Sequence, residues 1–292
     1  IRSGYQVGLF TSPHVSRIEE RIRINGKPIS SKRFDSALEI VHAASEELTF
    51  FEITFLASLV ACRDAGCEYM ILETGLGGRL DATRAAEVIG CLVTTISLEH
   101  SDILGETIEE IAKEKAAIPR TGIPILIKKP AENIQKSILE IAPHARFIAV
   151  EGNIHDEAQS LARELLIELK LPWNEGPIHW PARMQMIAGN PAILLDAAHN
   201  PSGIAKVMPQ IITELPDKWV LIFGSSPQND IEGFLKPIAS LIEQKNPKKV
   251  IFTEPQGGRY PPLSEFPLQG EWIRDPAKAI EVAKAEDCDL IL

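Results

Sequence analysis

Residues 71–83 read Ile-Leu-Glu-Thr-Gly-Leu-Gly-Gly-Arg-Leu-Asp-Ala-Thr, and this stretch indicates both a fold class and a site. It begins inside a short apolar run, residues 69–72, which has the length of a buried parallel strand. The run stops at the carboxylate of Glu73, and a glycine-rich turn follows. In open α/β sheets, ligands bind just beyond the carboxyl ends of the strands. An acid there, before glycines that let the backbone come close to a ligand, indicates a metal or phosphate site; the alternative is a plain turn with a solvated acid.

The composition excludes several classes of protein. The chain has 292 residues, 45% of them hydrophobic, and a formal net charge of −10. This length favours two domains, and the negative charge argues against nonspecific binding to nucleic acid, which needs a basic surface. No apolar run approaches the roughly 18 residues of a membrane span and no signal peptide is recognisable, so we expect a cytoplasmic protein. The four cysteines are not spaced like zinc ligands, so we expect reduced thiols in the core.

Strand-like runs alternate with helical patterns along the chain, which predicts α/β units around a mostly parallel sheet. Strands are expected at residues 6–10, 69–72, 91–98, 123–127, 145–150, 192–195, 219–223 and 248–252. Helices are expected at residues 32–47, 51–62, 107–118, 158–169 and 231–243. Proline and glycine interrupt any periodicity in residues 171–177, and the alternation restarts after them. We therefore expect two domains, residues 1–178 and 179–292.

A hydroxyl, a carboxylate and an imidazole follow three of the predicted strands, on Ser12, Glu73 and His100. Each residue alone has an ordinary structural explanation, such as capping or a surface position. Their common position predicts that they lie along one sheet edge as a site for Mg²⁺, which takes oxygen ligands readily and imidazole less often.

The helix predicted at residues 107–118 brings a lysine toward the interior. Thr107 and Glu110 form a capping box that sets its start. Steps of three and four residues place Lys115 on the face that carries the apolar residues, whereas Glu109 and Lys113 would pair on the other face. Such a lysine either extends its ammonium to water or serves an active site in a chemically modified form.

Seven segments carry a resemblance to a known family. They are Thr11–His14 (TSPH), Glu19–Arg23 (EERIR), Thr49–Glu52 (TFFE), Leu72–Thr83 (LETGLGGRLDAT), Glu114–Ile118 (EKAAI), Trp180–Arg183 (WPAR) and Leu195–Pro201 (LDAAHNP). Taken in order, they resemble the folylpolyglutamate synthase/dihydrofolate synthase family of the Mur ligase superfamily. This resemblance implies a Mur-ligase-like central domain followed by a smaller, Rossmann-like C-terminal domain.

The resemblance also implies a reaction, the ATP-dependent formation of an amide. A substrate carboxylate takes the γ-phosphoryl group of ATP and becomes an acyl phosphate, and the amino group of glutamate then displaces phosphate. Because the carboxylate and the nucleotide are both anionic, Mg²⁺ and a phosphate-binding loop must screen their repulsion.

Roles for individual residues follow from the matching motif positions. Ser12, Glu73 and His100 would be Mg²⁺ ligands, and Lys115 resembles a carbamylated catalytic lysine that helps to hold metal. The pocket for the pterin-bearing substrate would be lined by Thr49, Phe50, Phe51, Glu52, Leu80, Asp81 and Ala82.

The C-terminal domain would supply further contacts. Arg183 and Asp196 would contact ATP, and His199 would help to position the incoming glutamate. Without the family context, Arg183 reads as a surface cation and Asp196 as a strand-end acid.

The chain also departs from the family pattern. The phosphate-binding loop T-x-G-K-G-S/T, which precedes TSPH in the family, is absent, so we expect residues 1–292 to be a fragment, truncated at both ends, that does not turn over ATP alone. The remaining departures are Arg84 for Asn, Glu99 for Asp, Ala182 and Ala197 for glycines, and an altered loop at residues 224–230.

The preferred interpretation is a glutamate ligase that uses ATP and Mg²⁺ on folate or dihydropteroate, as a monomer without nucleic-acid or membrane partners. One alternative is another Mur-type ligase, which joins an amino acid to a cell-wall precursor. The other is a noncatalytic relative that binds folate or nucleotide. The TFFE and SPH segments favour the folate branch.

Overall fold

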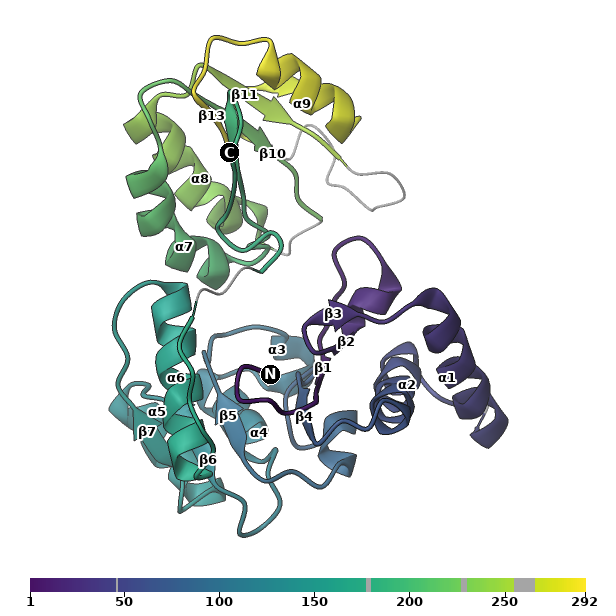
Figure 1. The fold of residues 1–292 in the computed structure, drawn as a ribbon. Coiled ribbons are helices and arrows are strands. Elements are labelled where there is room, and N and C mark those ends of the chain that lie inside the picture. Colours follow the sequence, from purple (N-terminus) through teal and green to yellow (C-terminus); the bar gives the residue numbers. More distant parts are fainter. Residues whose placement is uncertain (46, 177–179, 227–229, 255–265) are drawn as a thin grey trace. The chain divides into compact units, whose positions relative to one another are not determined.

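The computed structural model describes all residues except 46, 177–179, 227–229 and 255–265 (Figure 1). It divides into two compact units, Ile1–Gly176 and Pro177–Leu292. The domain boundary expected near residue 178 lies outside the described residues, as does part of the altered loop at residues 224–230.

The first unit opens with a four-stranded sheet in the order β3-β2-β1-β4. Its strands are β1 (Val7–Phe10), β2 (Ile22–Ile24), β3 (Lys27–Pro28) and β4 (Tyr69–Leu72). The central pair β1 and β4 is parallel, with Phe10 opposite Leu72, whereas β2 and β3 form an antiparallel hairpin that the sequence analysis did not predict. The two parallel strands therefore end at the same edge of the sheet.

Helix α1 (Ser31–Ala44) packs beside α2 (Phe50–Asp64), and α2 contacts strands β1 and β2 of this sheet (Figure 1). The core between them contains Phe10, Ile22 and Phe55, each at most 1% exposed. Burying a side chain of this size stabilises the fold by about 1.5–3 kcal/mol. The nearly all-apolar helix predicted at residues 51–62 is confirmed by the buried residues of α2.

A second sheet of the same unit is parallel throughout, in the order β5-β6-β7. Its strands are β5 (Cys91–Val93), β6 (Ile125–Lys128) and β7 (Arg146–Ile148), and its longer helices are α4 (Ile108–Ala116), α5 (Glu132–Ile141) and α6 (Ile154–Glu168). Short helical turns are η1 (Ile18–Arg21), η2 (Ala82–Ala85) and α3 (Ser101–Leu104). The strand expected at residues 91–98 is shorter than predicted, because pairing with β6 ends at Val93.

Helix α4 confirms one local prediction and contradicts another. Thr107 and Glu110 form the expected capping box. The predicted pair of Glu109 with Lys113 is wrong: Lys113 Nζ lies 2.6 Å from Glu140 Oε2, and Glu109 accepts a hydrogen bond from the side chain of Asn133. Both partners belong to α5, so contacts between helices replace the pairing along the helix.

The second unit is built on one six-stranded sheet in the order β12-β11-β10-β13-β9-β8. Its strands are β8 (Gln185–Ile187), β9 (Ala192–Leu195), β10 (Trp219–Phe223), β11 (Lys249–Phe252), β12 (Glu271–Trp272) and β13 (Leu290–Ile291). Among the described strands of this sheet, only β8 runs antiparallel to its neighbour. Helices α7 (Pro201–Glu214) and α8 (Ile231–Lys245) lie on one side of the sheet and α9 (Pro276–Lys284) on the other (Figure 1). The predicted α/β class with mostly parallel sheets is confirmed. Among the helices that the structure describes, none combines the length and the apolar character needed to cross a membrane.

Candidate functional site

The ends of β1 and β4 bring two of the predicted metal ligands together. The backbone amide of Ser12 donates a hydrogen bond of 2.8 Å to Oε2 of Glu73. The backbone amide of Glu73 in turn donates to the carbonyl of Phe10 at 3.0 Å, which continues the pairing of the strands. Glu73 is exposed, so its carboxylate can meet a ligand at the sheet edge.

A buried arginine, Arg21, belongs to the same corner although the sequence analysis gave it no role. It is 7% exposed, its Nε donates to Nδ1 of His14 at 3.0 Å, and its guanidinium carbon lies 5.0 Å from the centre of the Phe50 ring. Burial lowers the pKa of Arg21, and the nearby charge of Glu73 acts in the opposite direction. The EERIR segment contains a hint of this burial, because Arg21 directly precedes the alternating apolar and polar residues of a strand pattern.

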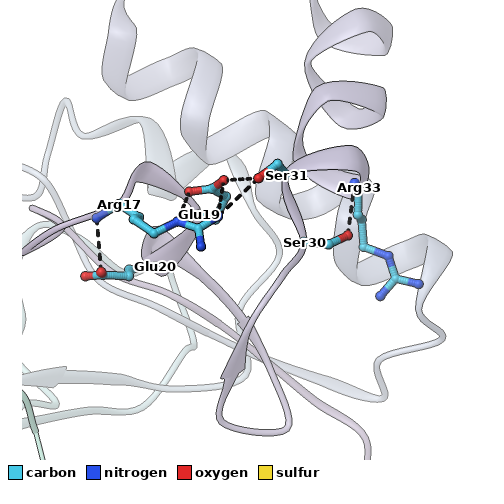
Figure 2. Close-up of polar contacts among 6 residues, drawn as sticks. All are labelled: Arg17, Glu19, Glu20, Ser30, Ser31 and Arg33. Atoms are coloured by element: carbon cyan, nitrogen blue, oxygen red, sulfur yellow. Dashed lines mark hydrogen bonds and ion pairs between the residues drawn. The ribbon is translucent and has the colours of Figure 1, made fainter.

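The loop between Ser12 and Arg21 is held by two adjacent glutamates with different partners (Figure 2). Glu20 accepts hydrogen bonds from the backbone amides of residues 15–17, which closes the loop on itself. Glu19 accepts from Nη2 of Arg17 at 2.9 Å and from the hydroxyl of Ser31 at 2.5 Å, so it ties the loop to the first turn of α1. The hydrogen bond from Arg17, and after it the one from Ser31, lower the pKa of Glu19 to about 2.

The expected substrate-pocket residues at the start of α2 divide into two kinds. Thr49 and Glu52 satisfy each other, because the Thr49 amide donates to Glu52 Oε2 at 2.7 Å and the Glu52 amide donates to Thr49 Oγ1 at 3.3 Å. The bonds from Thr49 also lower the pKa of Glu52. Phe50 is 54% exposed and contacts Arg21, whereas Phe51 is half-buried and packs against Phe10. Phe50 therefore offers an apolar surface to a ligand, and Thr49 and Glu52 begin the helix.

Asp81 organises the glycine-rich segment, residues 75–82, from within. Its Oδ2 accepts from the amides of Gly75 and Leu76, at 2.8 and 3.0 Å, and its Oδ1 accepts from the amide and the hydroxyl of Thr83. Leu80 is 80% exposed beside it, and Ala82 begins η2. Of the expected substrate residues in this segment, Leu80 is presented to solvent and Asp81 holds the turn.

The glycine-rich segment packs against the C-terminal end of α4, where Lys115 lies. A Cβ on Gly78 would stand 2.7 Å from the carbonyl oxygen of Glu114 and 3.0 Å from that of Lys115, so only glycine allows this approach. The amide of Arg79 donates to the same Glu114 carbonyl at 3.0 Å. Lys115 is half-buried, and none of the ion pairs among the described residues includes it.

His100 does not end a strand, which corrects the sequence analysis. Strand β5 stops seven positions earlier, and His100 is an exposed residue with φ 52° that directly precedes α3. Its carbonyl accepts hydrogen bonds from the amides of Ile103 and Leu104. Through α3 it is still linked to the site, because a Cβ on Gly77 would stand 2.7 Å from Leu104 Cδ2. Among the described residues, no group of three or more His, Cys, Asp or Glu side chains is arranged to hold a metal ion.

In the second unit, Asp196 holds the segment that carries Arg183. It accepts from the amide of Met184 at 2.9 Å and from that of Ala198 at 2.8 Å, directly after β9. Ala182, which replaces a glycine of the family pattern, has φ 53°, a conformation that glycine adopts without strain. The two expected ATP contacts thus come from one connected pair of turns.

His199, the residue expected to position glutamate, lies just beyond these turns. It is exposed, and its Nδ1 is 3.0 Å from the carbonyl oxygen of Ala197. The next residue, Asn200, caps α7 through the amide of Gly203.

Comparisons with known proteins agree with this fold and these motifs. No protein-family model matches the chain. A dihydrofolate synthase/folylpolyglutamate synthase of Escherichia coli is 29% identical over 332 residues, which cover 99% of this chain and 78% of that protein. A probable bifunctional folylpolyglutamate synthase/dihydropteroate synthase of Haloferax volcanii is 28% identical over 298 residues, which cover 83% of this chain but only 36% of that protein.

Solved structures give the same result. The E. coli FolC structure in complex with DHPP and ADP superposes with a TM-score of 0.83 at 25% identity, over 99% of this chain and 79% of that one. A bifunctional folylpolyglutamate synthase/dihydrofolate synthase with Mn, AMPPNP and L-glutamate bound has the same TM-score, identity and coverage. The fold is thus that of the two-domain, Mur-ligase-like α/β ligases. Within that class, the chain belongs to the folylpolyglutamate synthase/dihydrofolate synthase family.

Proposed function

We propose that the protein ligates L-glutamate to the carboxylate of a folate or of dihydropteroate, with ATP as the phosphoryl donor and an acyl phosphate as intermediate. The observation that carries the proposal is the corner formed by Ser12, Glu73 and Arg21, beside an exposed aromatic side chain and a glycine-rich segment. The names of the relatives and the ligands in their structures support the same reaction.

The residues of the first unit suit an anionic substrate and a hard cation. Glu73 is an exposed carboxylate, the ligand type that Mg²⁺ prefers, and the buried Arg21 near it moderates the local negative charge. Ser12, Glu73 and His100 would hold the metal, with Lys115 as the residue that completes the site. When bound, Mg²⁺ would screen the charges of the nucleotide and of the reacting carboxylate.

The chain's own groups would orient the other substrates. Phe50 and Leu80 present apolar surface on which a flat pterin ring can lie. Arg183 would supply a cation for a phosphate group, from a turn that Asp196 holds through the amide of the next residue, Met184. The exposed His199 is available to the incoming glutamate.

The remaining expectations concern the protein's context. We propose small-molecule partners only, a monomeric state and a cytoplasmic location. The ligands in the related structures are small molecules, which supports the first of these.

Release of ADP by the full-length protein tests the proposal. The assay contains ATP, Mg²⁺ and glutamate with either dihydropteroate or tetrahydrofolate, and each component is omitted in turn. We expect ADP release that requires both glutamate and one pterin substrate. Binding of pterin or nucleotide without turnover would instead favour the noncatalytic relative, and turnover with a cell-wall precursor alone would favour another Mur-type ligase.

A further inference from the structure

Arg79 and Glu114 connect the glycine-rich segment to helix α4 through two separate contacts. Nε of Arg79 donates to Oε1 of Glu114 at 2.7 Å, and the backbone amide of Arg79 donates to the Glu114 carbonyl at 3.0 Å. The two residues are 35 positions apart in the chain, so this connection is tertiary. In the sequence, Gly78 directly precedes Arg79 and Lys115 directly follows Glu114, and Gly78 lies against the carbonyl oxygens of both Glu114 and Lys115.

Two other arginines strengthen the same junction without using these side chains. Arg84 donates to the carbonyl of Arg79 at 3.4 Å, and Arg120 donates to the carbonyls of Arg84 and Ala85 at 3.4 and 3.3 Å. All three bonds use backbone acceptors. They would therefore survive a change of the side chain at position 79.

The exposure of the Arg79–Glu114 ion pair favours a role in positioning over a role in the stability of the fold. The side chain of Arg79 is 54% exposed and that of Glu114 is 24% exposed. Pairs as accessible as this contribute little to the free energy of unfolding. They can still fix a geometry, because the guanidinium is planar and donates in a defined direction.

We infer that Arg79 and Glu114 are positioning residues, which set the place of Lys115 relative to the glycine-rich segment and to Glu73. This inference rests on the proposed function, in which Lys115 completes the metal site. Displacing a reacting group by about 1 Å can cost roughly 10²-fold in rate. Loss of the pair should thus lower kcat far more than it raises the KM of any substrate.

A charge exchange in the full-length protein tests the inference. Arg79→Glu and Glu114→Arg are measured singly and together. Each single variant should lose about 10- to 100-fold in kcat, and the double variant, which restores an ion pair, should recover part of that loss. The matched control is the exchange Lys113→Glu with Glu140→Lys. This ion pair also starts from α4, at the residue next to Glu114, but it joins α4 to α5 and not to the glycine-rich segment. The control exchange should leave kcat within about twofold of wild type.

A second readout does not depend on activity. Amine acetylation, followed by mass spectrometry of the peptides, compares the labelling rate of Lys115 with that of Lys129 in each variant. The single variants should change this ratio and the double variant should restore it. If wild type releases no substrate-dependent ADP but the ratio responds in this way, the proposed function fails and the positioning role stands.

Three outcomes would overturn the inference. One is unchanged kcat and labelling in both single variants. Another is a loss no greater than that of the control exchange. The third is a pair of losses that simply add in the double variant, because independent effects would show that the two side chains are not coupled.

Discussion

The backbone amide of Ser12 donates a hydrogen bond of 2.8 Å to the carboxylate of Glu73, at the neighbouring ends of the parallel strands β1 and β4. The two residues are 61 positions apart in the sequence. The bond aligns a loop that carries Arg21 and His14 with the start of the glycine-rich segment. The carboxylate is therefore held in place before any ligand binds, which is what a hard cation requires of its site.

Removing the charge of Glu73 tests its role directly. Glu73→Gln keeps an oxygen that can accept the Ser12 amide but loses the negative charge that Mg²⁺ needs. We expect activity to fall by about 10²-fold or more, equivalent to roughly 2.7 kcal/mol, and the Mg²⁺ concentration for half-maximal rate to rise. Titration of ADP release with Mg²⁺ measures both, and a wild-type titration curve would exclude Glu73 as a ligand.

Lys115 should be required for activity but not for folding. Lys115→Ala removes a half-buried stem and a group that could carry a carbamate, so we expect loss of turnover with an unchanged unfolding midpoint. Short carboxylic acids in the buffer should restore part of the activity, because they supply the missing carboxylate. An active Lys115→Ala enzyme would contradict the assignment.

Arg21 should matter for both stability and substrate binding. Arg21→Met leaves an apolar stem but removes the bond to His14 and the contact with the Phe50 ring. We expect a loss of about 1–3 kcal/mol in the free energy of unfolding and a higher KM for the pterin substrate. Denaturant unfolding and initial rates measure these effects. The matched control is Arg63→Ala, an exposed arginine of α2, and equal losses in both variants would mean that Arg21 has no special role.

Substitutions of Arg183 and Asp196 should have different effects, because the first residue would contact ATP and the second also holds the local backbone. Arg183→Ala removes one cationic contact with ATP. Because a charge-assisted hydrogen bond contributes about 1.5–3 kcal/mol to binding, the KM for ATP should rise by roughly 10- to 150-fold. Asp196→Ala should also destabilise the second unit, because the amides of Met184 and Ala198 lose their acceptor. Unchanged ATP dependence in both variants would place the nucleotide elsewhere.

The lowered pKa of Glu19 predicts part of the acid sensitivity. Its carboxylate has a pKa of about 2 in the folded protein against an ordinary value of 4.5. The folded state therefore binds the proton less readily than the unfolded state. The stability that Glu19 contributes is complete above its unfolded pKa and is lost as the pH falls from about 4.5 to about 2.

Glu19→Gln should accordingly destabilise the protein near neutral pH, and its difference from wild type should shrink across that acidic range. Chemical unfolding at several pH values measures the difference. Glu39→Gln, an exposed glutamate of α1, is the control for the loss of a surface carboxylate. A constant difference at every pH would show that the carboxylate charge of Glu19 is not involved.

Local interactions account for what the sequence predicted well. The predicted capping box at Thr107 joins residues three positions apart, and strands β4, β9 and β10 were predicted with their observed bounds because each is a short apolar run between breakers. The family motifs were equally local, since each is a continuous segment. Fold class and family could therefore be argued from the sequence by itself.

Only the tertiary structure decided which distant groups meet. The ordering of strands makes neighbours of Ser12 and Glu73, and packing buries Arg21 against His14 and Phe50. The same packing pairs Lys113 with Glu140 of another helix, although Glu109 on its own helix is only four positions away in sequence. Periodicity describes the face of an element, but it carries no information about what covers that face. For this reason the sequence could name candidate groups, while long-range packing determined which of them share a site.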